Sequence, residues 1–104
     1  MNSDKAKAIP DNWKRLTAVF VALGDEQRQR IMLTFDKPGE ELNAGDLAAA
    51  SQLSRPAVSH HLKILHDSGC LTREKRGKEV FYKVAREHLL EAFGVAHSYI
   101  NEHS

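Results

Sequence analysis

The sequence predicts a single, mainly α-helical domain that carries one small β-hairpin. The chain has 104 residues, 41% of them hydrophobic and 28% charged, which suffices for one domain with a core and not for two. Its apolar residues follow helical spacing over several stretches but alternate with a period of two over residues 79–84. We therefore expect about five helices and a two-stranded antiparallel hairpin within residues 11–104, after a flexible N-terminal tail over residues 1–10.

Three helices are expected in the first half of the chain, each beside a side chain that can accept hydrogen bonds from free backbone N–H groups. The expected spans are about 13–23 after Asp11 or Asn12, 26–35 after Asp25, and 42–51 with Asn43 as the cap. Gly24 is expected to end the first helix in the left-handed conformation, which glycine adopts easily. Pro38 and Gly39 indicate a turn before the third helix.

The second half of the chain is predicted to form a longer helix, a hairpin and a last helix. Ser54 is a good N-cap and Pro56 lies in the first turn, where its missing N–H is not needed, so we expect a helix over residues 55–68 that ends at Gly69. The remaining elements are a hairpin at 71–84, with strands 71–76 and 79–84 joined by Gly77 and Lys78, and a helix over about 86–101.

The short helix ending near residue 51 joins the helix over 55–68 through a three-residue turn, whose Leu53 can fill the corner between them. This is the layout of a helix-turn-helix, and the hairpin behind it makes the predicted fold a winged helix-turn-helix. On a helical wheel Val58, Leu62 and Leu65 share one stripe, which we expect to be buried.

The opposite side of this helix carries hydrogen-bonding groups that need no burial. Arg55, Ser59 and Lys63 are spaced i, i+4 and i+8, so they form one exposed row that can reach base edges and phosphates from within a major groove. The hairpin would add cations beside an adjacent phosphate strand or minor groove. The residues expected to contact double-stranded DNA are Ser54, Arg55, Pro56, Ser59, His60, Lys63, Arg73, Lys75, Arg76 and Lys78.

The distribution of charge favours a partner that is a polyanion. The net charge of the whole chain is only +1, but residues 54–86 contain eight basic and three acidic side chains. Residues 87–104 contain three acidic side chains and no basic one. A local basic excess is typical of a nucleic-acid surface. The alternative is a winged helix that binds only proteins, with its basic row merely solvated; replacing Arg55 and Lys63 by alanine would separate the two.

The first and last helices carry more apolar surface than one small core uses. We expect them to form a homodimer interface, because a two-fold dimer also sets two recognition helices about one DNA turn apart. A well-packed monomer core is the alternative. The residues assigned to the interface are Trp13, Leu16, Phe20, Leu89, Phe93, Ala96 and Ile100.

Several segments resemble the ArsR/SmtB family of bacterial transcriptional regulators. Residues 53–65 read LSRPAVSHHLKIL, residues 68–71 read SGCL and residues 77–82 read GKEVFY, which is similar to the family signature. Residues 23–32, LGDEQRQRIM, resemble the family's second helix. The resemblance covers about residues 12–100 and implies a homodimeric winged-helix repressor that binds a palindromic operator and releases it when an inducer binds.

The resemblance also implies two places where members of the family hold metals. The thiolate site of the third helix falls on residues 42–47, which contain no cysteine. The site of the last helix falls on Arg86, His88, Tyr99 and Glu102, of which only His88 and Glu102 suit a cation. We therefore expect no metal site and no cofactor, unless a partner chain completes a site with His88 and Glu102. An organic effector, a redox signal and no inducer at all stay open.

Cys70 is the only cysteine and cannot form an intramolecular disulfide, so we expect a reduced protein in the cytoplasm. Its expected role is that of a small buried hydrophobe, and the alternative is a redox switch between helix and wing. From the short apolar runs we expect no signal peptide and no membrane-spanning segment.

Neither His60 nor His61 has an arrangement that indicates catalysis, and the sequence contains no phosphate loop or paired-carboxylate site. We expect His60 to contact phosphate or base, and His61 to be a hydrogen-bonded structural residue near the core. The sequence predicts no enzyme.

Overall fold

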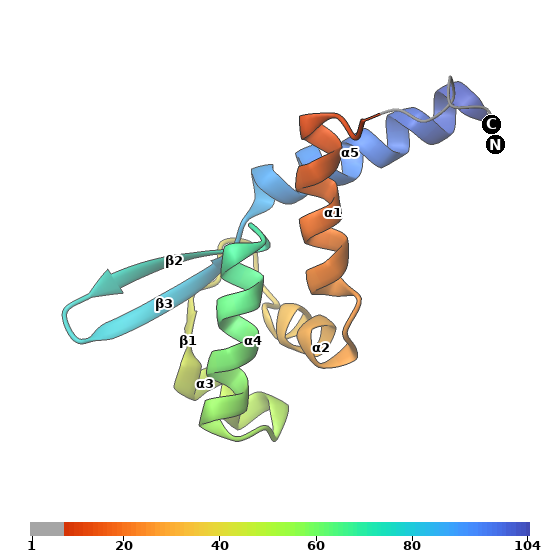
Figure 1. Ribbon diagram of the computed structural model, residues 1–104. Helices are drawn as coiled ribbons and strands as arrows, with labels where there is room; N and C mark the ends of the chain where they lie inside the picture. The colour runs from red at the N-terminus through yellow and green to blue at the C-terminus, as the bar shows by residue number, and fades with distance from the viewer. Residues whose placement is uncertain (1–7) are drawn as a thin grey trace.

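The computed structural model describes residues 8–104, and over this range the predicted winged helix-turn-helix is confirmed. The elements in chain order are α1 (Asp11–Leu23), α2 (Glu26–Thr34), β1 (Leu42–Asn43), α3 (Ala44–Ser51), α4 (Arg55–Asp67), β2 (Leu71–Arg76), β3 (Glu79–Val84) and α5 (Arg86–His103). Figure 1 shows the β2–β3 hairpin projecting on one side and α5 extending on the other. Of the predicted tail over 1–10, residues 1–7 lie outside the described residues.

Three of the predicted caps are confirmed. The carboxylate of Asp25 accepts hydrogen bonds from the N–H groups of Gln27 and Arg28 at 2.8 and 3.1 Å, where α2 begins. The side chain of Asn43 accepts from the N–H of Asp46 at 2.8 Å and forms a capping box with it. Ser54 Oγ accepts from the N–H of Ala57 at 3.3 Å, where α4 begins.

The predicted boundaries of α1 need two corrections. Neither Asp11 nor Asn12 caps the helix, because the carbonyl of Pro10 accepts from the N–H groups of Trp13 and Lys14 and Asp11 is already helical. Gly24 is not left-handed: its φ is −76°, and its N–H donates to the carbonyl of Val21. The chain therefore passes from α1 through Gly24 and Asp25 into α2 without any residue in the left-handed conformation.

The sheet has three strands and not the two that the sequence predicts. Its order is β1–β3–β2, and β1 pairs with β3 in antiparallel register, Leu42 opposite Tyr82 and Asn43 opposite Phe81. The prediction of a helix from residue 42 is wrong for these two residues, because Asn43 is extended as the N-cap of α3. The hairpin itself runs as predicted, turning at Gly77 with a positive φ of 63°.

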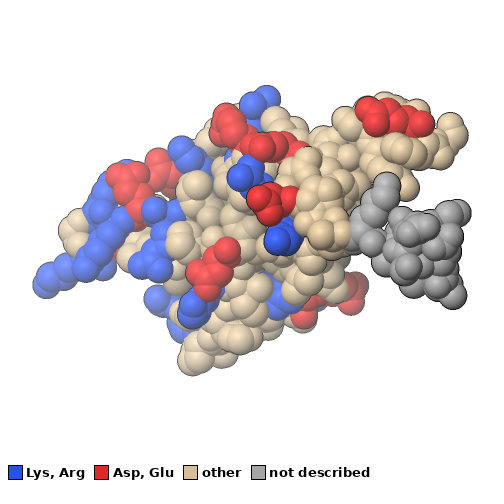
Figure 2. Space-filling model, turned by 45° about the horizontal axis from the view of Figure 1, so that its top comes forward, with Lys and Arg blue, Asp and Glu red and all other residues tan. Residues whose placement is uncertain are grey.

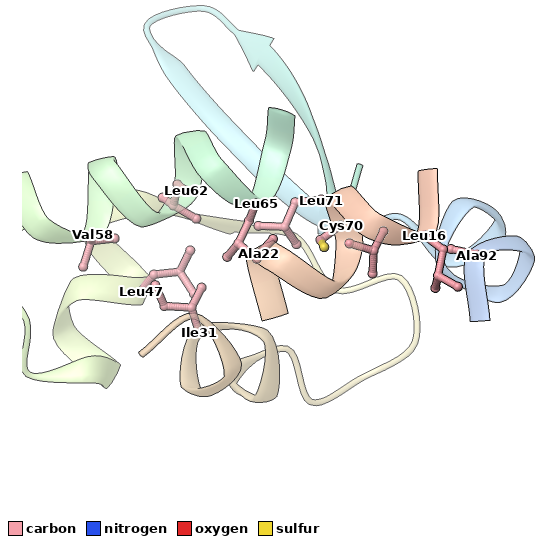
Figure 3. Close-up of a cluster of buried hydrophobic side chains, with 11 residues drawn as sticks. Leu16, Ala22, Ile31, Leu47, Val58, Leu62, Leu65, Cys70, Leu71 and Ala92 are labelled. Carbon is pink, nitrogen blue, oxygen red and sulfur yellow. The ribbon is translucent and has the colours of Figure 1, made fainter. Parts of the chain in front are cut away.

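One apolar core joins the helices to the base of the wing (Figure 3). Val58, Leu62 and Leu65 are fully buried, which confirms the predicted stripe of α4. The other members of the core come from α1, α2, α3, the turn between α4 and β2, the start of β2, and α5: Leu16, Val19, Ala22, Ile31, Leu47, Cys70, Leu71 and Ala92. None of the helices among residues 8–104 is both long and apolar enough to cross a membrane.

Candidate nucleic-acid interface

The face of α4 that points away from the core is lined by exposed polar side chains. Arg55, Ser59 and His60 are exposed, and none of their side chains has a hydrogen-bond or ion-pair partner among residues 8–104. Ser54 and Pro56 are exposed at the start of the helix. Burial of Val58 and Leu62 against the core fixes the rotation of α4 and so presents this row outward.

Lys63 stands at the end of the same row but is not free. Its ammonium donates to the carboxylate of Asp67 at 2.7 Å, one turn along the helix. This hydrogen bond holds the pKa of Asp67 below its ordinary value. The pair is exposed on both sides, so a phosphate can compete for the ammonium.

The wing carries two kinds of cation. Arg73, Lys75 and Lys78 are exposed and have no ion-pair partner within residues 8–104. Arg76 instead forms an ion pair with Glu41, and its guanidinium lies 4.2 Å from the ring centroid of Phe81. Arg76 therefore fastens the wing to the segment before β1.

A cleft of about 400 Å³ lies where the wing meets the start of α3 and α4. It is lined by Asn43, Ala44, Gly45, Arg55, Lys78, Glu79, Val80 and Tyr82. Figure 2 shows Lys and Arg side chains gathered over the projecting hairpin, with Asp and Glu side chains among them and spread over the rest of this face. The arrangement offers positive charge beside an exposed helix, which is what binding of a polyanion requires.

The two adjacent histidines of α4 lie in different surroundings, as expected. His60 is exposed, whereas His61 is half-buried with Nδ1 3.4 Å from a guanidinium nitrogen of Arg28. Arg28 also donates through Nε to the carbonyl of Ala22 at 2.6 Å. Arg28 thus connects α1, α2 and α4, a role that no motif in the sequence indicated.

The residues at the two family metal positions are spread apart or engaged elsewhere. Across residues 8–104 no three His, Cys, Asp or Glu side chains lie close enough to hold a metal ion. Tyr99 packs edge-on against Trp13 at 5.5 Å between centroids and stacks on His103 at 4.2 Å. The ring of His88 lies against Gly69, which has a φ of +85° and no space for a side chain.

Cys70 is fully buried at the junction of α4 and β2, as expected of a small hydrophobe. Burial raises the pKa of its thiol. Ser68 Oγ donates to Cys70 Sγ at 3.2 Å, and the backbone N–H of Cys70 donates to the carbonyl of Leu65.

The predicted interface residues of α1 and α5 divide into two groups. Phe20, Phe93 and Ile100 are 49%, 42% and 58% exposed, and the rings of Phe20 and Phe93 lie 5.9 Å apart between centroids. Trp13, Leu89 and Ala96 are half-buried. Leu16 is only 1% exposed: it packs inside the protomer and leaves no side-chain surface for a partner.

Comparison with known proteins agrees with this geometry. Residues 25–72 match the model of the family described as bacterial regulatory protein, arsR family. A transcriptional repressor SmtB homolog of Synechocystis is 32% identical over 92 residues, covering 88% of this chain and 68% of that protein. An ArsR-like transcriptional regulator from Rhodococcus superposes with a TM-score of 0.79 at 28% identity, covering 89% of this chain and 86% of that one.

A second solved structure shares the fold at lower sequence identity. The solution structure of a homodimeric winged helix-turn-helix DNA-binding domain from Mycobacterium bovis has a TM-score of 0.67 at 20% identity, covering 94% of this chain and 93% of that one. Fold and site together define a winged helix-turn-helix transcriptional regulator. The chain belongs to the ArsR family of bacterial regulatory proteins.

Proposed function

We propose that this protein is a dimeric transcriptional repressor that acts in the cytoplasm and binds a palindromic operator. The observation that carries the proposal is the row of unpartnered polar side chains on α4, Arg55, Ser59 and His60, beside the unpaired cations of the wing. In this proposal α4 enters the major groove, and the wing lies over the neighbouring phosphate strand or minor groove. Repression itself is inferred from relatives such as the SmtB homolog of Synechocystis.

In this proposal some side chains of α4 contact base edges and others contact phosphates. Ser59 and His60 are short and lie in the middle of the exposed face, where the major groove brings base edges within reach. Arg55 stands at the first turn and Lys63 two turns later, so they flank the readers on both sides. Contacts to phosphate fix the register of a protein on DNA, and contacts to base edges select the sequence.

The dimer in this proposal is built from α1 and α5. Phe20, Phe93 and Ile100 give an apolar face that the protomer leaves exposed, and Phe20 and Phe93 already touch across the two helices. Two-fold pairing of this face would place two copies of α4 about 34 Å apart, one turn of DNA. An operator with two inverted half-sites follows from that symmetry.

Release by soft metals through the third helix is not part of the proposal, because residues 42–47 supply no thiolate. No catalytic activity is proposed.

Selection of genomic fragments with purified protein tests the proposal, at two salt concentrations and with and without a chelator. We expect one palindromic sequence to be enriched under all four conditions. If no sequence is enriched at either salt concentration, the α4 assignment is wrong and the winged helix serves protein contacts. Enrichment that depends on the chelator would show that a metal controls binding.

The variant Arg55→Ala/Lys63→Ala separates DNA binding from that alternative. DNA affinity should collapse and depend less steeply on salt, while circular dichroism and sedimentation show the fold and dimer unchanged. An unchanged affinity would favour a protein-binding module.

A further inference from the structure

The cleft between the wing and the start of α3 and α4 joins cations from two distant parts of the sequence. Arg55 is the first residue of α4, and Lys78 lies in the turn of the hairpin, yet both line this one cleft of about 400 Å³. Neither has an ion-pair partner within residues 8–104. Two unpaired cations that line one cleft can attract a single anionic group.

Strand pairing, a helix cap and an ion pair hold the walls of the cleft in place. Asn43 pairs with Phe81 of β3 and also caps α3 through the N–H of Asp46, so one residue ties the wing to the helix. The ion pair of Arg76 with Glu41 fastens the wing a second time. The cleft is therefore preorganised, and an anion entering it need not order a loose hairpin.

Gly45 is another residue that lines the cleft. A Cβ atom at this position would lie 3.5 Å from Nη1 of Arg55 and 3.3 Å from Oδ1 of Asn43. The guanidinium of Arg55 thus lies close to a residue that carries no side chain. An Arg guanidinium can donate two hydrogen bonds to a phosphate, and a Lys ammonium adds a compact charge.

The other cations nearby are less suited to this role. Lys63 donates to Asp67, and Arg76 is engaged by Glu41 and stacked on Phe81. Glu79 is the one acidic side chain that lines the cleft, which leaves a lining charge of +1 from Arg55, Lys78 and Glu79. Charge in the cleft therefore favours an anion but is partly offset by Glu79.

We propose that Arg55 and Lys78 hold one and the same phosphate of the DNA backbone in this cleft, and so set affinity rather than sequence choice. The inference rests on the proposed function and refines it: the phosphate that Arg55 contacts is also the one that Lys78 of the wing contacts, while Ser59 and His60 read the bases. The wing and the recognition helix then bind the same phosphate of the DNA backbone. This shared contact limits how deeply α4 can enter the major groove.

The salt dependence of binding tests this assignment, because each neutralised phosphate contributes about 0.9 to the slope of log affinity against log salt. The proteins compared are wild type, Arg55→Ala, Lys78→Ala and the double variant. Each is titrated against a duplex carrying the selected palindrome and a scrambled duplex of equal length. A dimer has two clefts, so the double variant should lose about 1.8 from the slope. If each cation held its own phosphate, the loss would be about 3.6.

The affinity losses give a second readout. Either single variant should lose about tenfold on both duplexes alike, and the double variant should lose less than the product of the two. The matched control is Arg55→Ala combined with Arg73→Ala: Arg73 does not line the cleft, so these losses should multiply. Glu79→Gln should strengthen binding of both duplexes, since it removes the opposing charge.

Independent losses for Arg55 and Lys78, or a loss confined to the palindrome, would overturn the shared phosphate while leaving DNA binding intact. Absence of binding to either duplex by the wild-type protein would instead overturn the proposed function, and the inference with it. Circular dichroism of every variant shows whether the fold is kept.

Discussion

At the scale of single residues, exposure and pairing separate side chains that look equivalent in the sequence. His60 and His61 are neighbours, but only His60 is exposed on the outer face of α4. His61 is held near Arg28, so it belongs to the packing between helices.

The variant His60→Ala should relax sequence choice without changing the salt slope, because a side chain that contacts a base edge neutralises no phosphate and so releases no counterion. We expect a loss of about 1–3 kcal/mol on the palindrome and little change on scrambled DNA. Titration of both duplexes measures it, with Ser59→Ala as a companion. An equal loss on both duplexes would make His60 a phosphate residue instead.

The carboxylate of Asp25 caps α2, and this contribution to stability depends on pH. The backbone N–H of Arg28 above all, with the charge of Arg28 and the N–H of Gln27, holds the pKa of the Asp25 carboxyl below its ordinary value of 3.8. A lowered pKa means that this stabilisation is present above pH 3.8 and is lost as the pH falls through the folded value.

Urea unfolding between pH 7 and about pH 2 checks this linkage. Asp25→Asn keeps a capping oxygen but cannot titrate, so its free energy of unfolding should fall less with acid than that of wild type. Asp11→Asn, at a carboxyl that caps no helix, is the matched control. An acid profile of Asp25→Asn identical to that of wild type would contradict the assigned role.

Cys70 should resist thiol reagents in the folded protein, because burial both covers the sulfur and raises the pKa of its thiol. We expect labelling by a disulfide reagent at pH 8 to be at least ~100-fold slower than in urea. Fast labelling of the native protein would instead support the redox-switch alternative.

At the scale of elements, α4 has one face for the core and one for the partner. Leu62→Ala should lower the free energy of unfolding by about 2–5 kcal/mol, because Leu62 is fully buried among Val58, Leu65 and Leu47. His60→Ala, two positions away on the exposed face, should change it by less than about 0.5 kcal/mol. Denaturant titration of the two variants checks this contrast, and similar losses in both would contradict the orientation of α4.

The elements also show what the sequence could predict. Helix α4 and both strands of the hairpin are signalled locally, by a capping serine, an apolar stripe and a glycine turn, and they lie where expected. Strand β1 has only two residues, so no alternation can mark it; it exists because β3 pairs with it. The cleft was unpredictable for the same reason, since Arg55 and Lys78 meet only after the sheet forms.

At the scale of the whole molecule, basic and apolar surfaces occupy different ends. The wing and α4 carry several unpaired cations, whereas α5 carries Glu87, Glu91 and Glu102 together with exposed Phe93 and Ile100. Arg15 on α1 forms an ion pair with Glu91 at 2.8 Å, which helps hold α1 and α5 together. One end is thus suited to a polyanion and the other to a second copy of the chain.

Phe93→Glu should convert a dimer into a monomer, because it places a charge on the exposed apolar face of α1 and α5, beside Phe20. The matched control is Leu33→Glu: Leu33 is 81% exposed but lies on α2, outside this face. Sedimentation at micromolar concentration should find Leu33→Glu dimeric like wild type. A dimeric Phe93→Glu variant, or a monomeric wild type, would contradict the assigned interface.

The central claim is that a dimer of this chain reads a palindrome through α4. Fluorescence anisotropy of a labelled duplex tests it most directly, with the selected palindrome compared with a scrambled duplex at one fixed salt concentration. We predict saturation at two chains per duplex and an affinity for the palindrome at least about 10³-fold higher than for scrambled DNA. Equal affinity for the two duplexes, or saturation at one chain, would contradict the account.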